Sequence, residues 1–246
     1  MQLERILQSQ GFGTRKECRA LIRQGRCAVN AEIIDDPFAE LAPAGLAFAI
    51  DGEPWRYREK AYVLLHKPAD TECSRSPRGY PGVLSLLPRP LYERGMQSVG
   101  RLDVDTTGLL LLTDDGAFIH AVTSPKRKVN KVYRVTAKHP MTPAMLQQLV
   151  DGVVLNDAPD PVAGIAAVPV SDTVFDLTIR EGRYHQVKRM VAAAGNRVES
   201  LCRIAVGGLT LPTDMAPGGW RWLEEEDLKT LWGANVGDPG DDGEEA

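Results

Sequence analysis

Four consecutive leucines, Leu109 to Leu112, constrain the fold of this chain more than any other feature of the sequence. A strand with one exposed face alternates apolar and polar residues, so an unbroken leucine run is typical of a strand buried on both faces. A polar turn with Asp103 and Asp105 precedes the run and enters it through Thr106, Thr107 and Gly108. The sequence therefore anchors a carboxylate at the edge of a core, unless both aspartates only bond turn amides.

The length and composition indicate a globular chain with more than one unit. At about 150 residues per domain, 246 residues suggest one catalytic-sized domain and a smaller module. Hydrophobic residues at 43% and charged residues at 25% supply a full core and exclude bulk disorder. No apolar run approaches the ~20 residues that cross a bilayer, and the start, MQLERILQSQ, has no apolar signal region. We expect no membrane association and a cytoplasmic location.

The sequence contains no motif typical of a metal site or of a nucleotide-cofactor site. The cysteines and histidines are scattered, at Cys18, Cys27, Cys73, Cys202, His66, His120, His139 and His185. They form neither a C-x-x-C pair nor H-E-x-x-H, and no glycine-rich phosphate loop is present. We expect reduced thiols, no metal site and no cofactor.

The net charge of −4 argues against a nucleic-acid partner, but its distribution argues for one. Residues 233–246 hold five acids and no base, which predicts an acidic disordered tail and leaves residues 1–232 at +1. Residues 1–30 carry six bases and two acids, and residues 121–150 carry six bases and no acid. Such local basic patches are what contacts to RNA phosphates require.

The first part of the chain predicts a small module with two helices. Leu3, Ile6 and Leu7 have helical spacing, and Thr14 with Glu17 forms a capping box for a helix that runs to Gln24. One face of this second helix is apolar and the adjoining face is cationic, with Arg15, Lys16, Arg19 and Arg23. Residues 26–30 predict a strand that enters a turn. A solvated charged face is the alternative explanation for these bases.

The rest of the chain predicts an α+β domain with a mixed, largely antiparallel sheet. Residues 51–60, DGEPWRYREK, are predicted to be a linker, which divides the chain into domains 1–58 and 59–232 before the tail 233–246. The expected strands are Tyr62–Leu65, Leu109–Thr113, Val132–Lys138 and Val174–Arg180, and the expected helices are Ala144–Val150, His185–Ala194 and Glu225–Leu231.

The first module resembles a known RNA-binding module. The pattern T-R-K-E-C-x-x-L-I-x-x-G-R followed by V-N is similar to the S4-type module, which several RNA-modifying enzymes carry. This chain has Ala31 where the usual pattern has glycine. The resemblance implies RNA binding by the basic residues Arg15, Lys16, Arg19, Arg23 and Arg26.

The turn before the leucine run resembles the central motif of the pseudouridine synthases. G-R-L-D followed by D-T-T-G-L is typical of the RsuA-type branch, whose members also carry an S4 module. The resemblance implies that Asp103 is the catalytic nucleophile and that Arg101 helps to displace the target base. It leaves Asp105 with a turn-forming role. The alternative reaction, in which Asp103 removes a sugar proton to give a glycal, stays open from the sequence.

A second motif lies in residues 130–138, NKVYRVTAK. Alternation places Tyr133, Val135 and Ala137 on one face, with Lys131 and Arg134 off that face. A tyrosine on an apolar strand is by itself most simply a core residue. The K-x-Y-x-V pattern, however, resembles the family motif whose tyrosine stacks on the uracil and can serve in proton transfer, which implies a catalytic role for Tyr133.

A third motif, E-G-R-Y-H-Q-V-K-R-M, begins at Glu181 and enters a helix. Cations in a first helical turn oppose the helix dipole by roughly 0.3–1 kcal/mol each, so we expect an anionic partner there. The resemblance implies that Lys188 pairs with the catalytic aspartate and that Arg183 and Arg189 contact phosphates. His185 is expected to be a polar position beside the pocket. We also expect Lys126, Arg127 and Lys128, in the basic run 124–131, to contact RNA unless they form only a solvated loop.

Together the three motifs imply an enzyme that isomerises one uridine of folded RNA to pseudouridine without a metal or cofactor. The forms of the first and third motifs look most like those of members that act on 16S rRNA or a partly assembled small ribosomal subunit. A member that acts on 23S rRNA is the alternative, and a monomer is expected.

Two other classes of function remain open from the sequence. A non-catalytic RNA-binding assembly factor would keep the basic patches and tolerate the loss of Asp103. A glycoside hydrolase would use Asp103 and Asp105 as a pair separated by about 5–9.5 Å, but the first module has no role in that chemistry.

Overall fold

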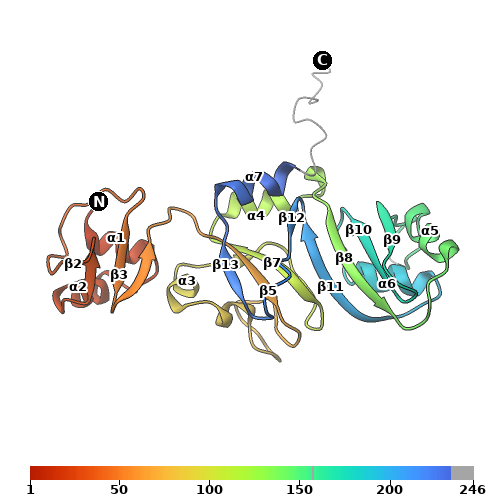
Figure 1. The fold of residues 1–246 in the computed structure, drawn as a ribbon, viewed down its shortest axis with the longest axis horizontal. Helices are drawn as coiled ribbons and strands as arrows, with labels where there is room; N and C mark the ends of the chain where they lie inside the picture. Colours follow the sequence, from red (N-terminus) through yellow and green to blue (C-terminus); the bar gives the residue numbers. More distant parts are fainter. Residues whose placement is uncertain (157, 234–246) are drawn as a thin grey trace, which may run out of the picture.

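The computed structural model describes residues 1–156 and 158–233, which fold around two separate β-sheets (Figure 1). The smaller sheet belongs to the first 56 residues, at one end of the elongated molecule, and the larger sheet begins at residue 62. The predicted acidic tail lies outside the described residues, except for Gly233, which ends the last helix.

The N-terminal module packs two helices on a four-stranded sheet. Its elements are α1 (Leu3–Ser9), α2 (Arg15–Arg23), β1 (Cys27–Val29), β2 (Glu32–Ile33), β3 (Ala47–Ile50) and β4 (Glu53–Arg56), with the strand order β2-β1-β3-β4. The predicted capping box is confirmed, because the Thr14 side chain accepts from the Glu17 amide and Glu17 caps the Thr14 amide in return. Leu3, Ile6 and Cys18 are fully buried in the module's core.

The predicted linker at residues 51–60 is wrong in its first half. Residues 53–56 form β4, which pairs antiparallel with β3 from Ala47 opposite Arg56 to Ile50 opposite Glu53. Asp51 and Gly52 have positive φ angles of 52° and 82° and make the tight turn of this hairpin. The proline, glycine and charges that suggested a linker therefore mark a hairpin turn and an edge strand, and only residues 57–61 connect the two sheets.

The larger sheet confirms the predicted α+β class and its mixed, largely antiparallel pairing. Its main strand order is β13-β5-β7-β11-β8-β10-β9. The strands are β5 (Tyr62–Lys67), β6 (Gln97–Ser98), β7 (Thr107–Thr113), β8 (Lys131–Ala137), β9 (Ala166–Pro169), β10 (Val174–Ile179), β11 (Val198–Val206), β12 (Leu209–Thr210) and β13 (Trp220–Trp222). Among the described strands, only β7 and β11 pair in parallel.

The leucine run lies in β7 and is buried on both faces, as predicted. Leu110 and Leu112 belong to a large core with α3 (Arg89–Glu93), α5 (Pro143–Asp151) and α6 (Gln186–Ala193). Leu109 and Leu111 belong to a second core under α4 (Gly116–Thr123) and α7 (Glu225–Gly233), which lie together beside β12 in Figure 1. One strand thus joins two cores, and the polar turn before it is held at their edge.

Sequence reasoning missed the nine-residue strand β11, which lies between β7 and β8 in the middle of the sheet. Glu199, Ser200 and Arg203 interrupt its apolar pattern. Arg203 is nevertheless only 3% exposed, so a buried charge hides the strand from an argument based on hydropathy.

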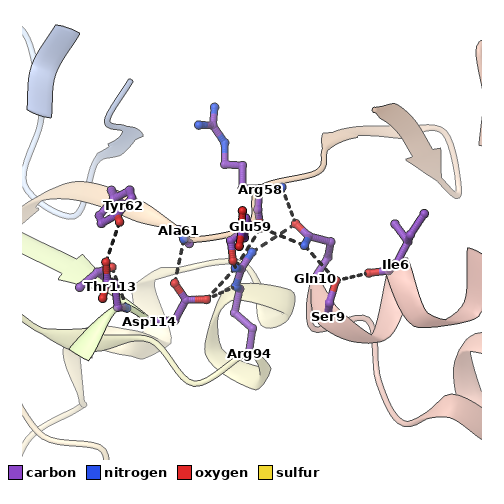
Figure 2. Close-up of polar contacts among 11 residues, drawn as sticks. Ile6, Ser9, Gln10, Arg58, Glu59, Ala61, Tyr62, Arg94, Thr113 and Asp114 are labelled. Carbon is purple, nitrogen blue, oxygen red and sulfur yellow. Dashed lines mark hydrogen bonds and ion pairs between the residues drawn. The ribbon is translucent and has the colours of Figure 1, made fainter. Parts of the chain in front are cut away.

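A buried polar network joins the two parts of the chain (Figure 2). The Arg94 guanidinium lies 2.6 Å from the Asp114 carboxylate and donates to the Arg58 carbonyl and to Gln10 Oε1. Gln10, at the end of α1, also exchanges two 3.0 Å hydrogen bonds with the Arg58 backbone, and Asp114 accepts from the Ala61 amide. The N-terminal module is therefore held against the larger domain by satisfied buried groups.

We predict that Arg94→Met lowers the free energy of unfolding by about 3 kcal/mol or more. The guanidinium is 3% exposed and Asp114 is 15% exposed, so the change leaves a mostly buried carboxylate without its cation. Urea denaturation measures the loss, and limited trypsin digestion after Arg58 and Lys60 reports whether the module has loosened.

The matched control for that experiment is Arg89→Met, on the same helix. Arg89 pairs with Glu93, but its side chain is 86% exposed, and such surface pairs contribute about 1 kcal/mol at most. Equal losses in the two variants would contradict the assigned role of Arg94.

The hairpin turn between β1 and β2 has a strained residue at Ala31. Asn30 and Ala31 have φ angles of 50° and 66°, so both positions of this two-residue turn are left-handed. Glycine and asparagine tolerate this conformation, whereas the Cβ atom of alanine makes it sterically strained. We predict that Ala31→Gly raises the free energy of unfolding by about 1 kcal/mol. Ala28→Gly, at a strand position without positive φ, should lower it.

Candidate active site

The loop that carries Asp103 is fixed from below by a buried lysine, Lys67. Lys67 ends β5 with no exposed surface, and its ammonium donates to the carbonyls of Pro68, Val104 and Thr106 at 3.0, 3.0 and 2.9 Å. Burial lowers the pKa of this lysine. Three carbonyl acceptors replace its hydration and fix the backbone on both sides of Asp105. Sequence reasoning missed Lys67 because a lysine is not expected inside a core.

Gly108 sets the position at which this loop enters the sheet. Its φ angle is +105°, and a Cβ atom there would lie 2.3 Å from the Arg203 carbonyl oxygen. Only a glycine lets β7 and β11 approach so closely, with Gly108 directly opposite Arg203. The turn with Asp103 is thereby brought beside β11 and its other neighbour, β8.

The third motif supplies the cation that faces Asp103. The Lys188 ammonium, on α6, lies 3.0 Å from Asp103 Oδ2 and 2.6 Å from Asp105 Oδ1. His185, which precedes α6 in a left-handed conformation, places Nε2 3.3 Å from Asp103 Oδ1. The predicted pairing of Lys188 with Asp103 is thus present in the structure. Asp105 shares the same cation, which its predicted turn-forming role did not include.

The charges of this cluster stabilise one another. Partial burial opposes the charged form of Lys188, but the hydrogen bonds that its ammonium donates to Asp105 and Asp103 outweigh this effect and raise the pKa of the ammonium. The hydrogen bond from Lys188 in turn lowers the pKa of Asp105. At neutral pH, Lys188 is therefore a cation that holds two carboxylates at the mouth of a pocket.

Two cavities meet beside Asp103 and share Arg101 and Tyr133 in their walls. The smaller, of about 70 Å³, contains Asp103 and His185. It also contains Thr106, whose buried hydroxyl has no hydrogen-bond partner among the described residues. The larger cavity, of about 440 Å³, extends from Tyr133 towards α4. Tyr133 is only 8% exposed and lies opposite Arg203 on the neighbouring strand.

The predicted orientation of Lys131 is wrong. Lys131 was expected off the face of Tyr133, but the two residues are two positions apart on β8 and both line the larger cavity. Side chains two apart on a strand share a face. Burial, with a smaller contribution from Arg203, lowers the pKa of Lys131 to about 8.

The remaining basic residues of the first and third motifs surround this site. Arg101 and Arg183 line both cavities, and Arg183 also pairs with Glu181 at 2.6 Å. Arg189 donates to the Tyr184 carbonyl. Tyr184 is 75% exposed and stacks on His185, with 3.8 Å between the ring centroids. The structure thus adds an exposed aromatic surface at the rim, which sequence reasoning did not predict.

The basic residues of the run 124–131 and of the first module differ in their exposure and in whether they pair with an acid. Lys126, Arg127 and Lys128 are exposed between α4 and β8. Arg15, Lys16 and Arg23 are exposed on α2, and Arg15 donates to Gln8. Arg19 pairs with the buried Glu4, and Arg26 donates to Asp51 at 2.7 Å, so both also hold the module together.

Within residues 1–156 and 158–233, no group of three or more histidine, cysteine, aspartate or glutamate side chains is arranged to hold a metal ion. No helix in the same part of the chain has the length and apolarity of a membrane span.

Comparison with known proteins identifies the family to which this site belongs. The model of the RNA pseudouridylate synthase family matches residues 61–193, a stretch that contains all three motifs. The chain belongs to this family. It is therefore an RNA pseudouridine synthase, an isomerase, and the family predicted from the motifs is confirmed.

Similar proteins extend the resemblance to most of the chain. The chain is 38% identical over 232 residues to the ribosomal small subunit pseudouridine synthase A of Escherichia coli, covering 94% of this chain and 100% of the relative. The protein of the same name from Yersinia pestis is 38% identical over 240 residues, which are 97% and 99% of the two chains. A crystal structure of a pseudouridylate synthase matches with a TM-score of 0.67 at 34% identity, covering 94% of this chain and 99% of the other.

We predict that the Lys131 ammonium of the free synthase titrates near pH 8, well below the ~10.4 of an ordinary lysine. NMR of ¹³C-methylated lysines during a pH titration measures this midpoint. Lys229 is the internal control, because the hydrogen bonds that its ammonium donates to Glu226 and Glu225 raise its pKa. A Lys131 midpoint as high as that of Lys229 would contradict the burial of its amine.

Proposed function

We propose that this synthase isomerises one uridine of 16S rRNA in the small ribosomal subunit, with Asp103 as the nucleophile. The observation that carries the proposal is the Asp103 carboxylate, held 3.0 Å from Lys188 beside the buried Tyr133. The relatives that share more than a third of its residues over nearly the whole chain are named for the small subunit. They support the choice of rRNA and subunit.

The reaction needs an ionised carboxylate and no net gain or loss of atoms. In the proposed reaction, Asp103 attacks C1′ of the ribose as the N1–C1′ bond breaks. The freed uracil turns in the pocket, its C5 bonds to C1′, and the Asp103–C1′ bond breaks. The C5 proton leaves and N1 takes up a proton. The Lys188 ammonium, 3.0 Å from Asp103 Oδ2, is the cation that faces this carboxylate.

The target uridine must first leave its stack, at a cost of a few kcal/mol. We propose that the Arg101 side chain fills the space that the uridine leaves in the RNA. Arg101 is exposed and lies at the junction of the two cavities. Tyr133 offers a ring for the displaced uracil, and the exposed Tyr184 ring offers a second stacking surface at the rim.

The N-terminal module is assigned a role in holding the RNA. We propose that it is an S4-type module and that its exposed Arg15, Lys16 and Arg23 contact phosphates. The run Lys126–Lys128 and the site arginines Arg183 and Arg189 extend these contacts to the catalytic domain. A monomer presents both surfaces to one RNA.

We predict that wild-type protein forms one new pseudouridine in 16S rRNA, bare or in partly assembled small subunits, and that Asp103→Asn lowers the rate by roughly 10³-fold or more. Loss of the carboxylate removes the nucleophile but leaves the pocket and its basic wall. Carbodiimide treatment followed by reverse transcription maps the product as a single new stop.

The matched control is Asp176→Asn, which removes a carboxylate from β10 that pairs with Arg134 at 2.8 Å, away from both cavities. This variant should keep its activity. A new stop in 23S rRNA instead would overturn the assigned subunit. No stop in either RNA, with tight binding retained by both proteins, would favour an assembly factor over the enzyme.

A further inference from the structure

The larger cavity beside the catalytic pocket has two chemically different walls. Val99, Leu111, Val122 and Val206 make one wall apolar. The other wall carries five cations, namely Arg101, Lys131, Arg180, Arg183 and Arg203, and a single acid, Glu181. Glu181 pairs with Arg183 on the cavity rim. Four cations of this wall therefore have no carboxylate within ion-pair distance among the described residues.

Arg203 is the most deeply buried of these cations. Its Nε atom donates to the Leu109 carbonyl at 2.8 Å, and the residue is 3% exposed. No ion pair of Arg203 exists within the described part of the chain, although buried arginines are rarely left without an acid. The strand pairing that places Arg203 opposite Tyr133 also directs both side chains to the same cavity.

Lys131 adds a second, half-buried cation to the same wall. Its ammonium donates to the carbonyls of Val129 and Arg180, each at 3.1 Å, which leaves one of its three donors unassigned by the described residues. Arg203 and Lys131 repel one another, and this repulsion contributes to the low pKa of the lysine. Two like charges held together and partly removed from water cost stability unless an anion joins them.

We propose that the Arg203 and Lys131 wall of this cavity binds a phosphate of the RNA backbone at the displaced uridine or its immediate neighbour. This inference takes the identity of the RNA from the proposed function, whereas the binding of a phosphate depends only on the residues of the cavity. Arginine and lysine N–H groups bind phosphate by short charge-assisted hydrogen bonds.

The larger cavity lies beside the Asp103 pocket, where we expect a phosphate next to the reacting ribose. Tyr133 and Arg101 line both cavities, so a ribose at Asp103 places its own phosphates at the boundary between them. A volume of about 440 Å³ lies within the ~300–1,000 Å³ typical of small-molecule sites. The apolar wall suits the ring of a nucleotide whose phosphate faces the cations.

The test compares the binding of uridine, 5′-UMP and 3′-UMP to the full-length protein by NMR or calorimetry. We expect at least one monophosphate to bind roughly ten-fold or more tightly than uridine, the factor that one charge-assisted hydrogen bond supplies. Arg203→Met should remove this difference and Arg203→Lys should retain part of it, with uridine binding little changed. Arg134→Met is the matched control, since Arg134 faces away from the cavity and pairs with Asp176.

Equal binding of uridine and both monophosphates by the wild type would overturn the proposal, as would an equal loss of uridine and monophosphate affinity in Arg203→Met. If Arg203→Met does not fold, the Lys131 titration in the wild type decides. Saturating 5′-UMP or 3′-UMP should then raise the Lys131 midpoint above pH 8, and an unchanged midpoint with both would overturn the site. These measurements need no turnover, so failure of the 16S rRNA assay with a preserved monophosphate preference would refute only the proposed function.

Discussion

The close parallel contact between β7 and β11 is the constraint on which the active site depends. Gly108 lies directly against the Arg203 backbone, where no side chain fits. This contact brings the Asp103 turn, which enters β7, next to the strand that pairs with Tyr133 on β8. Three segments far apart in the sequence thus meet at one end of a strand pair, and α6 places Lys188 beside Asp103.

Much of this arrangement was predictable because its signals are local. The buried leucine run, the Thr14 capping box and the helix of the third motif each depend on residues within a few positions. The motif resemblance then linked Asp103 with Lys188, which the structure brings to 3.0 Å. Such signals survive without knowledge of the tertiary fold.

Two features that the sequence did not predict each contain a buried charge. Arg203 disguises the central strand β11, and Lys67 ends β5 inside the protein, where three carbonyls hold its ammonium. Hydropathy assigns both residues to the surface, because the partners that make their burial tolerable come from distant segments. The error in the orientation of Lys131 has the same origin, since its charge argued for solvent and its position in the strand for the cavity.

Buried cations serve two different purposes in this fold. Lys67 and Arg94 are satisfied within the protein, by carbonyls and by Asp114, and they fix the Asp103 loop and the N-terminal module. Among the described residues, the hydrogen-bond partners of Arg203 and Lys131 are carbonyl groups. Their charge costs folding free energy that a neutral wall would not cost. In return, these cations form a site that is already organised to bind an anion. In an enzyme that modifies RNA, the available anion is phosphate.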